Sequence, residues 1–202
     1  MPNASFFTRF HLFVVRGFFD AAACAALRAQ MQTAAGRAAP VWVGDNPSVV
    51  KPTIRKAKLT ELPGETVSDT TSRLLALKPQ LEQHFGLTLQ GCQPLQFLTY
   101  RVGDFYRWHT DGANESDGRA VLTARRVSTV IFLNSEAEEP HEGAYCGGSL
   151  AFHELMNHPR GGSLGFPLIG EEGLLIAFPP SLPHEVTPVT HGERYTIATW
   201  YF

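Results

Sequence analysis

The chain has 202 residues, enough for one domain with a sizeable core and too few for two full domains. Hydrophobic residues make up 44% of it and charged residues 18%, which excludes a largely disordered chain. Lysine and arginine number 17 against 19 aspartates and glutamates, and this net charge of −2 excludes a dedicated binder of nucleic acid or anionic membranes.

The first predicted element is a helix over residues 21–33, which are rich in alanine, leucine and glutamine. Asp20 precedes it as the expected N-cap. A second helix is predicted from Ser68 or Asp69 to Phe85, because its leucines recur on one face, and Pro79 is expected to kink or split it. Residues 37–58, between the two helices, are predicted to form a hairpin or a mobile flap.

From about residue 94 the chain changes to short runs bounded by glycine, proline, asparagine and aspartate, which are typical of strands. The predicted strands are Leu95–Val102, Arg126–Leu133, Ser149–His153, Ser163–Pro167, Leu174–Phe178, Glu185–Val189 and Arg194–Phe202. Short strands without intervening helices favour a sandwich, jelly roll or barrel over a βαβ sheet. We therefore expect a mainly β fold with supporting α-helices packed outside one sheet. A single domain would span residues 1–202, with a helical support and flap at 1–93 and the β core at 94–202.

Targeting and cysteine signals are weak in this chain. The longest apolar runs fall far short of the roughly 20 residues of a membrane span, and the first residues do not resemble a signal peptide. The three cysteines, Cys24, Cys92 and Cys146, form neither a CxxC pattern nor a disulfide framework. We therefore expect a cytoplasmic protein that binds neither a membrane nor nucleic acid.

His109 and Asp111 are separated by one residue on an extended segment, so their side chains project to the same side. A third ligand from a distant strand would complete a 2-His-1-carboxylate face, which binds non-haem Fe(II) and leaves positions open. His184, at the start of a predicted strand, is the candidate. A competing pair, His191 and Glu193, is less suitable because the nine residues after Glu193 contain no third ligand.

Arg194 opens the last predicted strand, and Thr196, Ala198 and Trp200 share its face. A guanidinium and a hydroxyl on the inward face of a barrel strand need a buried anion. A dicarboxylate cosubstrate is such an anion, and the forked donor of arginine suits it.

The spacing from Tyr100 through Gly103, Tyr106 and His109 to Asp111 is Y-xx-G-xx-Y-xx-H-x-D. This run resembles the signature of the prolyl hydroxylase-like 2-oxoglutarate- and Fe(II)-dependent dioxygenases. The similarity continues in order through residues 130–134, 147–152, 183–188 and 192–202, and so covers roughly residues 95 to 202. The closing segment is most similar to the oxygen-sensor prolyl hydroxylase branch and its bacterial relatives.

The resemblance implies a double-stranded β-helix (jelly-roll, cupin-like) core with N-terminal helices on one sheet. It implies His109, Asp111 and His184 as iron ligands and Arg194 as the partner of the distal carboxylate of 2-oxoglutarate. Tyr100 would be a second hydrogen-bond donor near that cosubstrate.

The same resemblance implies the reaction. Fe(II), 2-oxoglutarate and O2 are expected as cofactor and cosubstrates, with ascorbate as a reductant. A prolyl residue of a protein or peptide would be hydroxylated while 2-oxoglutarate is decarboxylated to succinate and CO2. Thr196 would add a hydrogen bond to the cosubstrate, and Trp200 would form a wall of the metal site.

Three features depart from the family pattern. Phe132 stands where the oxygen sensors carry a tyrosine that reaches the cosubstrate, so one hydroxyl is missing. Arg194 follows His184 by ten residues, as in the collagen-type enzymes, and residues 153–172 indicate a longer loop than usual. These departures concern the substrate and leave the metal chemistry unchanged.

Substrate contacts are expected in the flap, which covers residues 38–58 and carries the candidate contacts Trp42, Arg55, Lys56 and Lys58. Tyr106 and Trp108 are expected to pack or to line the entrance. The histidines outside ligand spacing, expected on the surface or in loops, are His11, His84, His141, His153 and His158.

Three alternatives remain open. The same chemistry could act on a free amino acid or another small molecule, in a closed pocket. A non-catalytic, cupin-like module could sense iron or 2-oxoglutarate. A zinc hydrolase could use the same triad with a water in the open position, although it would lack an obvious general base and leave Arg194 without a role.

Overall fold

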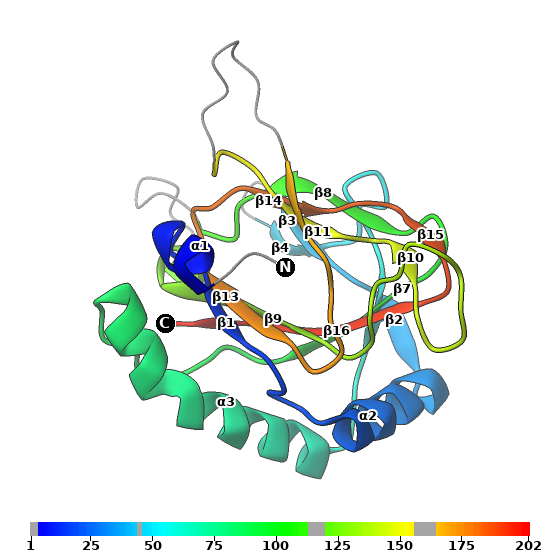
Figure 1. Ribbon diagram of the computed structural model, residues 1–202, viewed down its shortest axis with the longest axis horizontal. Helices are drawn as coiled ribbons and strands as arrows, with labels where there is room; N and C mark the ends of the chain where they lie inside the picture. The colour runs from blue at the N-terminus through cyan, green and yellow to red at the C-terminus, as the bar shows by residue number, and fades with distance from the viewer. Residues whose placement is uncertain (1–3, 44–45, 113–119, 156–164) are drawn as a thin grey trace.

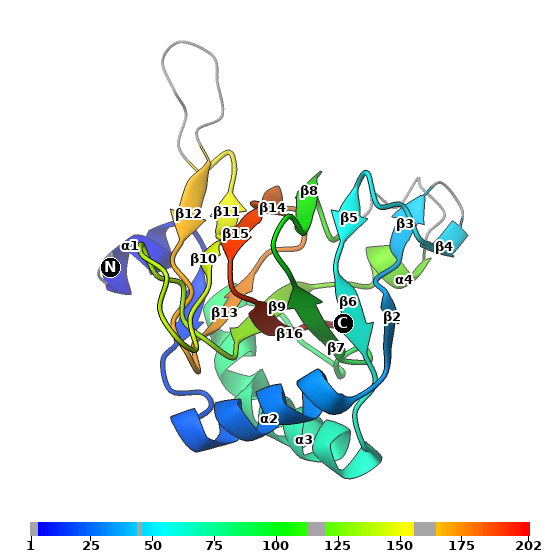
Figure 2. The same cartoon turned by 90° about the vertical axis from the view of Figure 1, so that its right-hand side faces the viewer.

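The computed structural model describes residues 4–43, 46–112, 120–155 and 165–202. Two antiparallel sheets lie face to face and form the core of a double-stranded β-helix, which confirms the expected fold class (Figure 2). The larger sheet has the order β1 (Phe13–Val15), β13 (Leu175–Phe178), β9 (Val127–Phe132), β16 (Arg194–Tyr201), β7 (Gln96–Tyr100), β6 (Lys58–Thr60) and β2 (Gly36–Ala38). The smaller sheet has the order β12 (Phe166–Leu168), β11 (Leu150–Phe152), β14 (His184–Val186), β8 (Phe105–His109) and β5 (Arg55–Lys56).

Two further antiparallel pairs complete the strands. β10 (Cys146–Gly147) pairs with β15 (Val189–His191), and β3 (Val41–Val43) pairs with β4 (Asn46–Val49). The second pair is the hairpin expected between the predicted helices. Two short helices, α1 (Ala4–Arg9) and α4 (Ala120–Thr123), lie on opposite sides of the molecule (Figure 2).

The long helices α2 (Ala21–Thr33) and α3 (Gly64–Phe85) cover the outer face of the larger sheet, as expected (Figures 1 and 2). α2 has its predicted bounds, and Oδ1 of its N-cap Asp20 accepts a hydrogen bond from the Ala23 N–H at 2.8 Å. Buried apolar residues join the helices to the sheet: Leu27, Met31, Leu74, Leu77, Leu81, Ile131, Leu175, Ile197 and Tyr201. This layer fixes the backbone of β16, whose opposite face lines the site.

α3 differs from its predicted form in two ways. It begins at Gly64 instead of Ser68 or Asp69, and it runs unbroken through Pro79 to Phe85. Pro79 removes the donor to the carbonyl of Leu75, but both residues lie on the exposed face of the helix, where water can hydrate that carbonyl. Gly86 then ends α3 in the left-handed conformation, at a φ of 66°.

The predicted strands of the β core are found with shifted ends, and Glu185–Val189 is divided between β14 and β15. β8 and β10 of the β core lie outside the predicted strands. The short strands β1, β2, β5 and β6 were not predicted either. They lie in the first 93 residues and join both sheets, so that this part of the chain supplies strands as well as helices. A strand of two or three residues is too short to show an alternating sequence pattern. Such strands form because they pair with a neighbouring strand.

A phenylalanine-rich cluster fills part of the space between the two sheets. It combines Phe132 and Phe178 of the larger sheet with Leu150 and Phe152 of the smaller one, and all four are almost fully buried. The space beside this cluster is a cavity, described below. Within the described residues, no helix is long and apolar enough to cross a membrane.

Candidate metal centre

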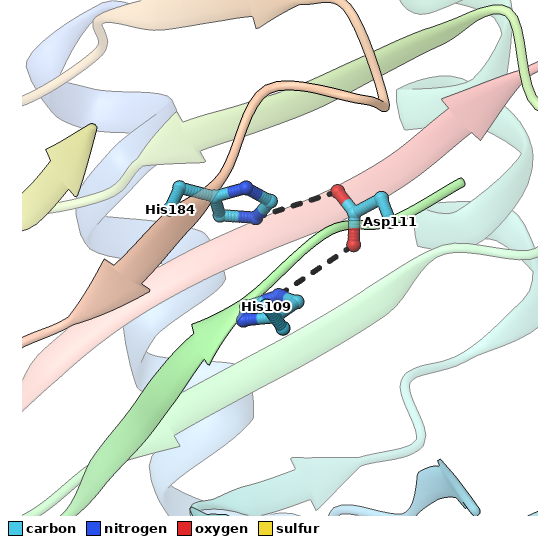
Figure 3. A group of neighbouring side chains, drawn as sticks. All are labelled: His109, Asp111 and His184. Atoms are coloured by element: carbon cyan, nitrogen blue, oxygen red, sulfur yellow. Dashed lines mark ion pairs between the residues drawn. The ribbon is translucent and has the colours of Figure 1, made fainter. Parts of the chain in front are cut away.

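His109, Asp111 and His184 come together at one end of the smaller sheet (Figure 3). His109 is the last residue of β8 and His184 the first of β14, and the two residues are direct partners in the antiparallel pairing. Asp111 follows His109 by two residues and turns back toward both rings. The strand register therefore brings a distant histidine to the His-x-Asp pair, as the sequence pattern predicts.

The candidate ligand atoms face one another across a gap. Nε2 of His184 lies 3.5 Å from Oδ2 of Asp111, and Nε2 of His109 lies 3.7 Å from Oδ1. These separations exceed a normal hydrogen bond, and all three ligand atoms lie within 4.8 Å of one another. Two neutral nitrogens and one carboxylate form a donor set suited to a divalent transition metal such as Fe(II).

Main-chain carbonyls orient both imidazoles. Nδ1 of His109 lies 2.8 Å from the carbonyl oxygen of Arg107, and Nδ1 of His184 lies 2.9 Å from that of Leu182. A proton on Nδ1 satisfies each carbonyl and leaves the lone pair of Nε2 directed at the gap. This is the arrangement that metal-binding histidines use.

The electrostatics of the triad also fit a cation. Burial, followed by the neighbouring His109, lowers the pKa of His184 to about 4, so that its imidazole is neutral at neutral pH. Burial alone would raise the pKa of Asp111, but His184, His109 and Arg125 outweigh it and hold this pKa well below its usual range. The site therefore presents the negative charge of Asp111 beside the neutral imidazole of His184.

The triad opens into a cavity of about 380 Å³ between the two sheets. Its wall combines the triad with side chains from β7 and β16 of the larger sheet. Trp108, which is 54% exposed, lies at the open side. Tyr106 also lines the cavity, and its ring stacks on His109 with centroids 3.6 Å apart.

Arg194 lies in the same cavity and is 1% exposed. One of its terminal nitrogens donates to Oγ1 of Thr196 at 3.2 Å, while its Nε has no hydrogen-bond partner among the described residues. No carboxylate of the described chain forms an ion pair with it. Glu136 interacts with the Arg194 charge but forms no ion pair with it. A buried guanidinium without a directly paired carboxylate is costly, so this end of the cavity fits the carboxylate of a bound molecule.

The other residues proposed for the cosubstrate also line the cavity. Tyr100 is paired directly with Arg194 across β7 and β16, and its ring centroid lies 5.1 Å from the guanidinium carbon. Because the Thr196 oxygen accepts a hydrogen bond from Arg194, its own hydroxyl proton remains free for a second acceptor. Trp200 forms part of the wall and stacks under Arg125 at 3.7 Å.

Phe132 does leave the buried end of the site without the tyrosine hydroxyl of the oxygen sensors, and its ring lies 5.1 Å from the Arg194 guanidinium carbon. Tyr145, which the sequence analysis did not single out, is fully buried near Arg194, and its hydroxyl has no partner among the described residues. Burial raises the pKa of Tyr145, although the Arg194 charge opposes that shift, so the hydroxyl stays protonated. A single tyrosine outside a recognised motif gives no sequence signal of this kind.

The flap contacts proposed from sequence separate into two groups. Arg55 lines the cavity, whereas Lys56 pairs with Asp104 at 2.9 Å and Lys58 donates to main-chain carbonyls at the end of α2. The side chain of Trp42 lies outside the described residues. Lys56 and Lys58 therefore hold the sheet edges together instead of lining the cavity.

Sequence reasoning missed Arg125, which lines the cavity just before β9 and donates to the main-chain oxygen of Asp111 at 2.9 Å. The competing pair His191 and Glu193 has no third ligand among the described residues, and Glu193 instead accepts from Arg101 at 3.0 Å. In the long loop, His153 lies 3.1 Å from Glu185, and residues 156–164, including His158, lie outside the described part of the chain.

Comparison with known proteins gives one family. The model of the 2OG-Fe(II) oxygenase superfamily matches residues 95–202, which contain the triad and Arg194. A PKHD-type hydroxylase of Shewanella oneidensis is 33% identical over 116 residues, or 56% of this chain and 44% of that protein. A PKHD-type hydroxylase of Klebsiella pneumoniae is 32% identical over 104 residues, or 52% of this chain and 40% of that protein. The match thus spans less than half the length of these relatives.

Solved structures share the whole fold. A prolyl-4-hydroxylase of Pseudomonas putida aligns with a TM-score of 0.67 at 24% identity, over 95% of this chain and 91% of that chain. A prolyl hydroxylase of Trichoplax adhaerens, solved with a peptide fragment of the hypoxia inducible factor oxygen degradation domain, aligns with a TM-score of 0.68 at 19% identity. That alignment covers 98% of this chain and 86% of that chain.

Proposed function

Because the chain belongs to the 2OG-Fe(II) oxygenase superfamily, we propose that it is a dioxygenase dependent on Fe(II) and 2-oxoglutarate. The observation that carries this proposal is one cavity that holds both a His-Asp-His cluster and a buried guanidinium without a counterion in the described chain. In the proposed reaction, one oxygen atom of O2 enters an unactivated C–H bond of the substrate. The other enters succinate, which forms with CO2 from 2-oxoglutarate.

His109, Asp111 and His184 are the proposed iron ligands. Bound iron supplies the redox chemistry that activates O2. The protein contributes the carboxylate charge of Asp111 and two imidazoles, each held by a carbonyl at Nδ1. Three ligands on one face leave positions for the cosubstrate and O2.

Arg194 is the proposed partner of the distal carboxylate of 2-oxoglutarate. Its burial removes competing water, so that a charge-assisted hydrogen bond is strong here. The Thr196 hydroxyl and Tyr100, which line the same cavity, are the further proposed donors to this molecule. Trp200 closes the wall on this side and helps to exclude water.

The proposed substrate is a prolyl residue in a protein or peptide. This is supported by the structural likeness to prolyl hydroxylases, one of which was solved with a peptide. A free amino acid or small molecule is the alternative substrate, and a non-catalytic sensor of iron or 2-oxoglutarate is the alternative function. The complete triad beside Arg194 favours turnover, because a site that has lost its catalytic role would be expected to lose ligands.

The remaining parts of the proposal concern the whole protein. Residues 1–202 form one dioxygenase domain, with the support at 1–93 and the β-helix core at 94–202. Ascorbate acts as a reductant that keeps the iron in its ferrous state. The cytoplasm is the proposed location, supported by three cysteines that are all free.

Anaerobic titration tests the proposed function directly. The metal-free protein is titrated with Fe(II) and then with 2-oxoglutarate, and a visible charge-transfer band of the chelate is expected. After O2 is admitted, release of succinate should increase with a proline-containing peptide. Tight Zn(II) binding without any band on addition of Fe(II) and 2-oxoglutarate would overturn the dioxygenase proposal in favour of a hydrolase.

A further inference from the structure

Two arginines besides Arg194 line the cavity, Arg55 of β5 and Arg125 just before β9. In the described part of the wall, Asp111 is the sole acidic residue. The proposed iron and cosubstrate do not account for these two additional cations.

Both guanidinium groups bond only to neutral oxygens in the described chain. Arg125 donates to the main-chain oxygen of Asp111 at 2.9 Å and to the amide oxygen of Gln93 at 3.0 Å. Arg55 donates to the carbonyl of Pro40 at 3.2 Å and to the amide oxygen of Gln96 at 3.1 Å, and its buried Nε has no partner. Each arginine therefore keeps N–H donors free and has no carboxylate partner among the described residues.

Aromatic rings hold both groups beside the candidate metal centre. The guanidinium carbon of Arg55 lies 4.7 Å from the ring centroid of Tyr106, and Tyr106 stacks on His109. The guanidinium carbon of Arg125 lies 3.7 Å from the ring centroid of Trp200, while its hydrogen bond reaches Asp111. Stacking covers the faces of the two guanidiniums and leaves their edges, which carry the donors, for hydrogen bonding.

The two cations are close enough to repel each other. Both guanidinium groups belong to the wall of the same cavity. Holding like charges together in a partly buried wall costs free energy, and a bound anion between them would lower that cost. Such an arrangement is typical of a site completed by an anionic ligand.

The charges of the cavity require an anion in addition to the cosubstrate. Iron(II) and the 2-oxoglutarate dianion cancel, and Asp111 balances one of the three arginines in the wall. Two positive charges remain next to the position of the substrate. On the basis of the proposed function, we propose that the substrate carries a carboxylate close to the C–H bond that is hydroxylated. Arg55 and Arg125 bind this carboxylate.

Such a carboxylate has more than one source. It is an acidic side chain beside the target residue of a peptide, the C-terminal carboxylate of a peptide that ends at the target, or the carboxylate of a free amino acid. All three present the same planar acceptor to the same donors. They differ in whether chain continues past the target residue, so binding measurements can distinguish them.

Binding is measured by calorimetry on the protein loaded anaerobically with Fe(II) and 2-oxoglutarate, so that no turnover occurs. The probes are alanine-rich pentapeptides with a central proline and blocked ends, carrying either glutamate or glutamine after the proline. Further probes are a peptide with a free carboxylate on the proline, a phosphoserine peptide and free L-proline. At least one carboxylate probe should bind about tenfold or more tightly than the glutamine peptide.

Arg55→Gln and Arg125→Gln should each remove most of this preference and leave the affinity for 2-oxoglutarate within about twofold of the wild type. Arg55→Gln is the cleaner variant, because Arg55 does not contact Asp111. Arg16→Gln is the matched control, since Arg16 is exposed and pairs with Glu171 outside the cavity. It should leave the preference unchanged.

Several results would overturn the inference while the charge-transfer band keeps the proposed function intact. They are equal binding of glutamate and glutamine peptides, no binding of any carboxylate probe, or a stronger preference for the phosphoserine peptide. Loss of 2-oxoglutarate binding in Arg55→Gln would also overturn it, by assigning that arginine to the cosubstrate. Absence of the band in the wild type would count instead against the proposed function.

Discussion

His184 on β14 lies directly opposite His109 on β8, with ring centroids 4.2 Å apart. The pairing register between two strands therefore sets the distance between the two candidate nitrogen ligands. A slip of one residue would turn one imidazole to the other face of the sheet. Asp111, just beyond the end of β8, supplies the charge between the rings, so each part of the triad can be tested separately.

Asp111→Asn should reduce Fe(II) affinity by about 100-fold or more, because the amide keeps the shape of the side chain and loses the anionic ligand. The measurement is anaerobic Fe(II) titration followed by the charge-transfer band with 2-oxoglutarate. Glu193→Gln is the matched control, since it removes a carboxylate from the competing His191-x-Glu193 pair. Equal loss of Fe(II) binding in both variants would count against the assigned triad.

Arg194→Met should change protein stability and cosubstrate affinity in opposite directions. Methionine removes a buried cation that has no counterion in the described chain, so the ligand-free protein should become more stable by about 1–3 kcal/mol. Affinity for 2-oxoglutarate should fall by about 100-fold, while Fe(II) affinity stays near its wild-type value. Urea unfolding and 2-oxoglutarate titration measure the two effects.

The control for this variant is Arg37→Met. Arg37 is exposed, and its Nε lies 3.7 Å from Oε1 of Glu61. Neither the stability of the Arg37→Met protein nor its affinity for 2-oxoglutarate should therefore change appreciably. An unchanged 2-oxoglutarate affinity in Arg194→Met would contradict the assignment of Arg194 to the cosubstrate.

Residues with strong local or motif signals could be predicted from sequence. The helix over residues 21–33 has its predicted ends because Asp20 caps it and thirteen residues repeat a helical pattern. Strand alternation directs His109 and Asp111 to one side, but this pair alone is a weak signal, and its assignment also needs His184, Arg194 and the resemblance to a known family. The helix and the pair itself depend on chemistry within a few residues of chain.

Features that depend on tertiary partners could not be predicted. Arg125 enters the cavity because it follows a short helix and turns toward Trp200 and Asp111, contacts that no local pattern encodes. β5 has only two residues and forms by pairing with β8. Pro79 lies within an unbroken helix because its face of α3 is exposed, whereas the sequence alone indicates a kink.

Pro79→Ala should stabilise the protein by about 1–2 kcal/mol. Alanine restores an N–H donor for the carbonyl of Leu75 and has a higher helix propensity, and the greater entropy of the unfolded chain offsets part of this gain. Thermal and urea unfolding provide the measurement. Ala76→Gly, at an exposed position of the same helix, is the control and should lower stability by about 1 kcal/mol. A destabilised Pro79→Ala would show that the proline ring packs favourably here.

The metal-free protein should lose stability as the pH falls from about 6.5 to about 4. The pKa of His184 is lowered from 6.5 to about 4 by burial and the nearby His109, so the unfolded chain binds its proton first. Stability from this group is full above the unfolded pKa and declines toward the folded one. Urea unfolding midpoints across this pH range measure how steeply stability depends on pH. His184→Gln should reduce the slope, and an unchanged slope would assign it to other groups.

Gly170 lies against the buried end of the site, and Gly170→Ala should disturb it. A Cβ there would lie 2.3 Å from the Tyr145 hydroxyl and 2.6 Å from the ring of Phe132, both fully buried. The overpacking should cost about 1–3 kcal/mol and, because Phe132 contacts Arg194, weaken 2-oxoglutarate binding. Gly64→Ala, at an open position starting α3, should leave both quantities unchanged or raise stability slightly. If Gly170→Ala lowered stability without weakening 2-oxoglutarate binding, Phe132 would be a packing residue with no part in positioning Arg194.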